Sequence, residues 1–232
     1  MITRLGKVRV FFAGPRAGTG GEASGGSCGV IVTVTSNKGG VSKTTTSMHL
    51  AGYLADCGGG GRTVVVDLDP NASALDWAAR AEKGGRPLPF VVVGPGEDYG
   101  EAEHVIFDSP GRLYGEELEA MAEVSDLVVV PTLPARLSVD VLAGFVTDLA
   151  EVGRADAYKV LLTMVPRWNL RGRQAREELG GVGVPLFRRS IRLRPAFDTA
   201  ADRGALVRDV RVRGAQDGWD DYMAFGREVV EG

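Results

Sequence analysis

The sequence predicts an α/β fold, with a doubly wound and mostly parallel sheet that carries helices on both faces. From residue 30 onward, short apolar runs rich in β-branched residues alternate with stretches of helical periodicity. The runs are continuously apolar, which is typical of strands buried on both faces of a parallel sheet. A glycine-rich segment follows the first run directly. Ligands of such folds bind beyond the carboxyl ends of the strands, so reactive side chains are expected just after each run.

The expected elements cover most of the chain. Strands are predicted at residues 30–35, 63–69, 89–93, 104–108, 126–131, 158–165 and 184–187. Helices are predicted at residues 43–57, 72–83, 114–123, 137–152, 171–180, 196–203 and 217–230. Residues 30–232 are expected to form a single domain with one sizeable core. Residues 1–29 are predicted to be a flexible extension, because their second half is rich in Gly, Ser and Ala, and residues 8–12 are a candidate edge strand.

Charge is unevenly placed along the chain. The formal net charge is -3, which argues against a general nucleic-acid binder. Residues 160–214, however, hold twelve arginines and five acids, so a local basic face is expected on an acidic protein. No apolar run approaches the roughly 20 residues needed to cross a bilayer, and no secretory pattern opens the sequence. We therefore expect a cytoplasmic protein. The last predicted helix, residues 217–230, is acidic and lacks a basic amphipathic face, so no membrane binding is expected.

The glycine-rich segment reads SNKGGVSKTTT at residues 36–46, and a helix is predicted from Lys43. A turn between a strand and a helix presents backbone N–H groups and the helix N-terminus to phosphate oxygens. Lys43 is expected to contact the β- and γ-phosphates, and Thr44 is expected to hold Mg²⁺ through its hydroxyl. The sequence therefore predicts the nucleotide site of a P-loop NTPase, made of Lys38, Gly39, Gly40, Val41, Ser42, Lys43, Thr44 and Thr45.

The order K-G-G-V-x-K-T-T resembles the deviant Walker A motif of the ParA and MinD ATPases. The resemblance implies catalytic roles for Lys43 and for a second lysine, Lys38, which would reach the nucleotide of a partner subunit. It also implies ATP as the ligand, Mg²⁺ as the cofactor and a homodimer that forms on ATP. Ser42 departs from the family, which usually has glycine there, so its side chain is expected to strain the loop or slow turnover.

Acidic residues follow the next buried strands. Asp67 and Asp69 end the run at 63–69 and share one face because they are two apart. Asp108 ends the run at 104–108, which has the form of a Walker B strand. By the resemblance, Asp69 positions the attacking water, Asp67 supports Mg²⁺ through its water shell, and Asp108 holds a Mg²⁺-bound water. The alternative for Asp67 and Asp69 is that they only cap the next helix.

Two later segments extend the resemblance. Thr163 and Pro166 stand where members of the family contact adenine, and a core or turn role for both is an equal alternative. The segment from residue 188 to 204 resembles the arginine-bearing ending of ParA proteins, which faces DNA. Arginines spaced by two along an extended loop project to one side and hold phosphates without reading bases. The predicted DNA contacts are Arg171, Arg173, Arg189, Arg192 and Arg194, and ion pairs with nearby acids are the alternative.

The resemblance covers about residues 30–215. It implies a DNA-partition ATPase for a plasmid or a chromosome, whose ATP-bound dimer associates with non-specific DNA on the nucleoid. A ParB-like partner would stimulate slow ATP hydrolysis and so release the dimer. Three alternatives stay open. In the first, the same kind of ATPase positions another cargo. In the second, the chain is a biosynthetic P-loop ligase or kinase that acts on a small acid. In the third, it is a nucleotide-binding switch with almost no hydrolysis.

Overall fold

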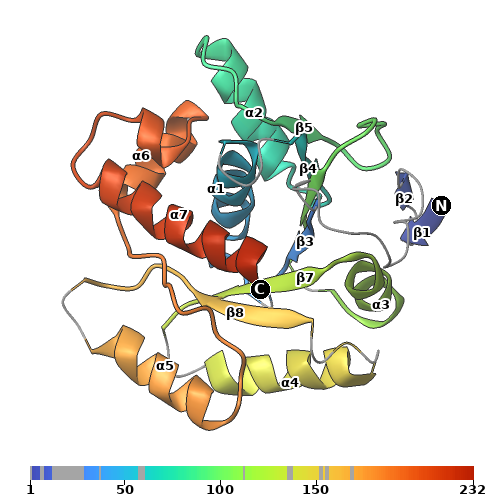
Figure 1. Cartoon of the computed structure of the whole chain (residues 1–232), viewed down its shortest axis with the longest axis vertical. Coiled ribbons are helices and arrows are strands. Elements are labelled where there is room, and N and C mark those ends of the chain that lie inside the picture. The colour runs from blue at the N-terminus through green and yellow to red at the C-terminus, as the bar shows by residue number, and fades with distance from the viewer. Residues whose placement is uncertain are drawn as a thin grey trace, which may run out of the picture.

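The computed structural model describes residues 2–5, 8–11, 29–36, 38–56, 61–111, 113–134, 138–151, 154, 157–167 and 170–232. Six strands form one sheet in the order β5-β4-β6-β3-β7-β8, and every neighbouring pair is parallel. The strands are β3 (Ile31–Val34), β4 (Thr63–Asp67), β5 (Val91–Val93), β6 (His104–Asp108), β7 (Leu127–Thr132) and β8 (Tyr158–Leu162). The doubly wound parallel fold expected from the sequence is confirmed (Figure 1).

Helices cover both faces of this sheet (Figure 1). One face carries α1 (Lys43–Asp56), α2 (Ser73–Lys83), α6 (Pro195–Arg203), the 3-10 helix η1 (Val207–Asp209) and α7 (Ala215–Glu231), whose apolar side chains share one core. The other face carries α3 (Gly115–Val124), α4 (Ser138–Glu151) and α5 (Arg171–Gly181), with a second core. All seven predicted helices are present, and each boundary lies within two residues of its predicted position. No helix in the described ranges is long and apolar enough to cross a membrane.

Two predicted strands differ from the structure. Residues 184–187 form only an isolated bridge between Leu186 and Val160, because Pro185 has no N–H to donate and the chain leaves the sheet edge. The run at 8–12 becomes β2 (Val8–Phe11), which pairs with β1 (Ile2–Leu5) in a separate antiparallel sheet and does not extend the main one. The remaining part of the expected flexible extension, residues 12–28, lies outside the described residues.

Strand register brings the predicted acidic residues to one edge of the sheet. Asp108 is in register with Val34 of β3 on one side and with Asp67 of β4 on the other. The glycine-rich loop leaves β3 at this same edge, two residues after Val34. Because all these strands are parallel, their carboxyl ends lie at the same edge of the sheet. In folds of this kind the ligand binds in the crevice beyond these ends, at the point where the order of the strands changes direction.

Helices α2 and α6 approach closely at Gly204. This residue caps α6 with a φ of 63°, in the left-handed region. A Cβ atom here would lie 2.3 Å from the backbone nitrogen of Ala81 and 2.4 Å from the carbonyl oxygen of Trp77, both in α2. Only glycine satisfies the conformation and the contact together, so Gly204 fixes how α6 ends against α2.

Candidate nucleotide-binding site

The loop between β3 and α1 is shaped to surround an anion. Gly40 and Ser42 both have a φ of 71°, which turns the backbone sharply before α1 begins at Lys43. No heavy atom lies within 4 Å of where a Cβ would sit on Gly39 or Gly40, so the outer side of the loop is open. Backbone N–H groups of such a turn, together with the positive end of α1, attract phosphate oxygens.

Ser42 holds the strained position of the loop. Its φ of 71° lies in the left-handed region, which glycine adopts freely and other residues adopt at a cost of roughly 1–2 kcal/mol. The strain expected from the sequence is therefore present in the backbone itself. Ser42 also accepts the first hydrogen bond of α1, since its carbonyl receives the N–H of Thr46 at 2.9 Å.

Asp108 ties the start of α1 to the end of β6. The Thr44 hydroxyl donates to its Oδ2 at 2.7 Å, and the Ser47 hydroxyl donates to its Oδ1 at 2.9 Å. Burial raises the pKa of Asp108 to about 6, the two hydroxyl groups oppose that shift, and Asp67 adds to it. Sequence analysis missed Ser47, although its position one turn after Thr44 places both hydroxyls on one face of the helix.

Asp69 lies beside the lysine of the loop. Its Oδ2 is 3.9 Å from Nζ of Lys43, and both side chains are nearly buried. The other oxygen, Oδ1, accepts hydrogen bonds from the backbone and the side-chain amide of Asn71, at 2.9 and 2.8 Å. Asn71 therefore fixes the direction of the Asp69 carboxylate, and its place two residues after Asp69 is the only sign of this role in the sequence.

Asp67 serves as a helix cap in this structure. Its Oδ2 accepts the backbone N–H groups of Ala74 and Leu75 at 2.9 and 3.0 Å, and its Oδ1 accepts that of Asp69 at 3.1 Å. Burial raises the pKa of Asp67, while these three backbone donors oppose the rise. The capping alternative from the sequence is thus realised, and support of Mg²⁺ by Asp67 stays a prediction.

Thr163 contacts the loop from the other side. It is fully buried, and its hydroxyl donates to the carbonyl of Val41 at 3.0 Å. The structure therefore gives Thr163 a supporting contact to the phosphate loop, while its predicted contact with a base remains untested. Pro166 lines a cavity of about 360 Å³ whose wall includes Arg167, Arg173, Arg176 and Arg192.

The five arginines predicted to face DNA divide into two groups. Arg171, Arg173 and Arg189 are exposed. Arg192 is held by Asp221 of α7 with two short hydrogen bonds, and Arg194 is only 8% exposed and pairs with Asp217 at 2.9 Å. Arg173 pairs with Glu177, near it in sequence, at 3.7 Å, and the ion-pair alternative is also realised for Arg192 and Arg194, in their case with acids of α7. Long-range pairing of this kind cannot be read from sequence spacing.

Helix α1 also carries a buried histidine that connects the loop to the opposite end of the chain. His49 donates from Nδ1 to the carbonyl of Thr45 at 2.7 Å, and its Nε2 accepts the N–H of Val207 at 2.9 Å. Its ring stacks on Tyr222 with centroids 4.7 Å apart. Burial lowers the pKa of His49 to about 4, so the neutral ring fills a packing role.

The side chains at the sheet edge fit a magnesium ion bound together with phosphate. Mg²⁺ in such sites uses a loop hydroxyl, one or two carboxylates and phosphate oxygens, with water completing its shell. Thr44 and Asp108 supply the hydroxyl and the carboxylate within 2.7 Å of each other. Within the described residues no three His, Cys, Asp or Glu side chains gather as a metal site.

A strand, a phosphate loop, a helix and two strand-end carboxylates together define a P-loop nucleotide-binding domain. The chain belongs to the family of CobQ/CobB/MinD/ParA nucleotide binding domains, CbiA, which matches residues 32–207. The family resemblance seen in the sequence motifs is confirmed.

The chain is similar to a carboxysome distribution protein and to proteins of chromosome and plasmid partition. It is 33% identical to the maintenance of carboxysome distribution protein A of Gloeobacter kilaueensis, over 86% of this chain and 93% of that protein. It is also 33% identical to the chromosome-partitioning ATPase Soj of Thermus thermophilus, over 58% of this chain and 45% of Soj. A putative plasmid partition protein of Borrelia burgdorferi bound to AMPPNP has the same fold, with a TM-score of 0.68, 16% identity, and coverage of 86% of this chain and 99% of that one.

Proposed function

We propose that the chain is an ATPase that binds ATP with Mg²⁺, dimerises on it, associates with non-specific DNA and is released from DNA by slow, partner-stimulated hydrolysis. The observation that carries the proposal is the pair of lysines around one loop. Lys43 lies 3.9 Å from Asp69 inside the site, whereas Lys38 is exposed on the outer side of the loop. A lysine in that position is free to reach a nucleotide held by a second subunit.

The residues around the loop have separable roles in this proposal. Mg²⁺ would neutralise phosphate charge from Thr44 and Asp108. Lys43 and the loop N–H groups would hold the phosphate oxygens, and Asp69, fixed by Asn71, would orient the attacking water. Such positioning is most of what phosphoryl transfer requires of a protein.

Two cargoes are compatible with this cycle. The partition of a plasmid or chromosome with a ParB-like partner is the first. Positioning of a protein assembly is the second, and the similarity over 93% of a carboxysome distribution protein favours it, because the match to Soj spans less than half of that protein. A ParB-like gene beside the gene for this chain would favour partition. Turnover stimulated by a small acid in the absence of DNA would instead favour a biosynthetic ligase or kinase.

The test of the ATPase cycle is the oligomeric state with ATP, with ADP and without nucleotide, measured by analytical ultracentrifugation alongside ATP binding and hydrolysis. The native chain should dimerise only with ATP. Lys38→Ala should bind ATP as a monomer and lose turnover, and Lys43→Ala should lose ATP binding. Arg227→Ala, which removes an exposed cation from α7, is the matched control and should behave as the native chain. Dimerisation of Lys38→Ala at native strength would refute the role of Lys38.

A further inference from the structure

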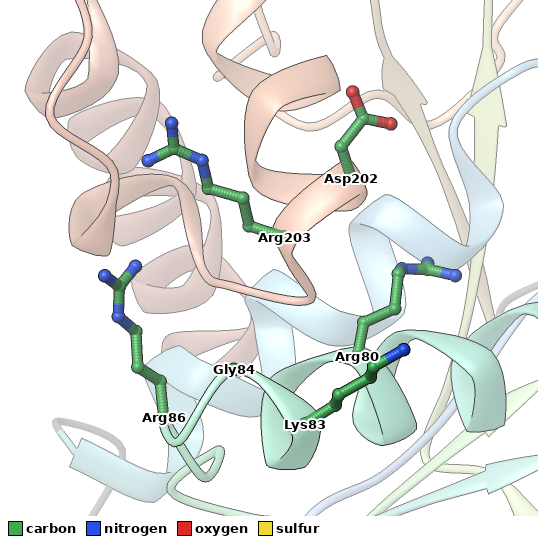
Figure 2. Close-up of a pocket in the computed structure, with 6 residues that line it drawn as sticks. All are labelled: Arg80, Lys83, Gly84, Arg86, Asp202 and Arg203. Carbon is green, nitrogen blue, oxygen red and sulfur yellow. The ribbon is translucent and has the colours of Figure 1, made fainter.

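A second basic surface lies away from the arginines of residues 160–194, in a groove between the ends of α2 and α6. Its lining is Arg80, Lys83, Gly84, Arg86, Asp202 and Arg203, around about 480 Å³ (Figure 2). A neighbouring hollow of about 400 Å³ shares Arg86 and Arg203 and adds Asp209 and Arg211. The two hollows therefore form one groove, called here the α2–α6 groove.

Most cations of the α2–α6 groove take no part in contacts that hold the fold together. Arg80 donates from Nε to the carbonyl of Ala201 at 3.0 Å and so joins α2 to α6. Lys83, Arg86, Arg203 and Arg211 are exposed, and in the described part of the chain none of them has a carboxylate within salt-bridge distance. Figure 2 shows Arg86 and Arg203 projecting together on one side of the groove, with Arg80 and Lys83 on the other.

Helix ends account for only part of this charge. The carboxyl ends of α2 and α6 meet at the groove, and each carries about half of a negative elementary charge, which Lys83 and Arg203 in the last turns offset. Asp202 and Asp209 supply two further negative charges against five cations. Among the residues that line the groove, a net charge of roughly +2 therefore remains.

We infer that the α2–α6 groove binds the phosphodiester backbone of DNA, an inference that rests on the DNA association proposed above. The lining of the groove, in the described part of the chain, consists of charged residues and glycine, whereas the centre of a protein interface is apolar and aromatic. The arginines and lysine that line it in the described part of the chain can hold phosphate oxygens whatever the base sequence. The backbone of DNA, with its regularly repeated anionic charge, matches that chemistry.

Gly204 makes the groove possible. By allowing α6 to end in contact with the backbone of Ala81 and Trp77, it brings Arg203 to the same side of the groove as Arg86 and opposite Lys83 (Figure 2). The five cations come from three separate parts of the chain, around residues 80–86, 203 and 211, and only the fold brings them together. The groove and the outward arginines Arg173 and Arg189 thus form two candidate surfaces for one ligand, which makes them separable by mutation.

The test is the affinity of the full chain for an arbitrary DNA duplex in ATP, measured by fluorescence anisotropy at several salt concentrations. Three double variants each remove two arginines: Arg86→Gln/Arg203→Gln in the groove, Arg173→Gln/Arg189→Gln on the other surface, and Arg62→Gln/Arg227→Gln as the matched control. The groove variant should bind DNA about tenfold more weakly near 0.1 M salt and lower the slope of log K against log salt by about 2 per protomer. The control should bind as the native chain does. ATP affinity and circular dichroism establish that each variant is folded.

The other outcomes overturn the inference in distinguishable ways. If the groove variant binds DNA as the native chain does and only Arg173→Gln/Arg189→Gln loses binding, the DNA association stands and the groove has no part in it. If the control loses affinity equally, the effect is one of net charge and the groove is again excluded. If the native chain binds no DNA in ATP, the proposed DNA association fails together with the groove. Binding of poly-glutamate but not DNA, lost in the groove variant, would identify an acidic protein as the occupant instead.

Discussion

Asp221 of α7 holds the guanidinium of Arg192 with hydrogen bonds of 2.6 and 2.8 Å, and a third bond of 3.2 Å joins the backbone N–H of Arg192 to the same carboxylate. Asp221 is 5% exposed. The pair therefore anchors the segment before α6 to the last helix, and it neutralises a cation that the sequence assigned to DNA. Charge that is already paired in the folded chain contributes little to phosphate binding.

Arg192→Ala should lower the free energy of unfolding by about 2 kcal/mol, because it leaves the buried carboxylate of Asp221 without its partner. The expected loss is below that for a fully buried pair, since the Arg192 side chain is 36% exposed. Arg173→Ala is the comparison, because Arg173 and its partner Glu177 are both more than two-thirds exposed, and it should change stability by less than about 0.5 kcal/mol. Urea unfolding measures both, and equal effects would contradict the structural role of Arg192.

Ser42→Gly should stabilise the protein by roughly 0.5–1 kcal/mol. The substitution relieves a left-handed backbone, and part of that gain is offset by the greater freedom of glycine in the unfolded chain. Gly40→Ala is the reciprocal change at the same φ with open space around the new Cβ, and it should destabilise by a similar amount. Thermal or urea unfolding without nucleotide measures the change in the free energy of unfolding for both variants. A Ser42→Gly protein less stable than the native chain would show that the Ser42 side chain compensates its own strain.

The contribution of His49 to the stability of the native chain should fall as the pH is lowered from 6.5 toward 4, while the raised pKa of Asp108 acts in the opposite direction. The pKa of His49 is about 4 in the folded protein and close to 6.5 when unfolded, so the unfolded chain binds the proton first and acid favours unfolding. Above pH 6.5 this contribution is fully present, and by pH 5 about 2 kcal/mol of it is lost. Urea unfolding of the native chain and of His49→Gln across this range isolates the effect. NMR titration of the ring in the native chain provides an independent check, and a pKa near 6.5 there would refute the burial argument.

Gly204→Ala should destabilise the protein by more than about 2 kcal/mol. The added methyl group would overlap backbone atoms of Ala81 and Trp77, which have no flexible side-chain end to move away, and the φ of 63° is unfavourable as well. Gly180→Ala is the matched control, because Gly180 lies inside α5 with open space around it and alanine there should stabilise by about 0.5–1 kcal/mol. Similar shifts in the unfolding midpoint for both variants would contradict the close packing of α2 and α6.

Thr163→Val should weaken ATP and ADP binding by the same factor, about fivefold. Valine preserves the shape of Thr163 but removes the hydroxyl that supports the carbonyl of Val41, which corresponds to roughly 1 kcal/mol. Affinities for ATP, ADP and GTP, measured by calorimetry, separate the two interpretations of this residue. A change confined to the preference for adenine over guanine would indicate a base contact, and an equal loss for all three would indicate support of the loop.

Elements and local motifs were predictable because their signals are local. Continuous apolar runs, the loop before Lys43 and the acid at the end of each strand are all defined by a few neighbouring residues, and parallel pairing then fixes which of them meet. The same holds for Ser42, whose position before Lys43 already indicated strain.

Partners distant in sequence were not predictable. Asp221 and Asp217 lie more than twenty residues from the arginines that they hold, and no spacing rule connects a loop to a helix that follows it so far along the chain. The α2–α6 groove was missed for the same reason, because Lys83 and Arg86 lie in a part of the chain that is acidic on average. The capping role of Asp67 was foreseen as an alternative, but only the position of α2 could decide between that role and a metal ligand.

The contact between α1 and α7 has a mechanical consequence. Helix α1 starts at the phosphate loop, and its Thr46 hydroxyl lies 3.3 Å from that of Tyr222 in α7. Tyr222 is adjacent in sequence to Asp221, which accepts hydrogen bonds from the guanidinium of Arg192. The first turn of α1 thus contacts the middle of α7, and these two helices connect the phosphate loop to the arginine segment. A displacement of α1 would therefore press directly on the α7 segment that carries Asp221, the partner of Arg192.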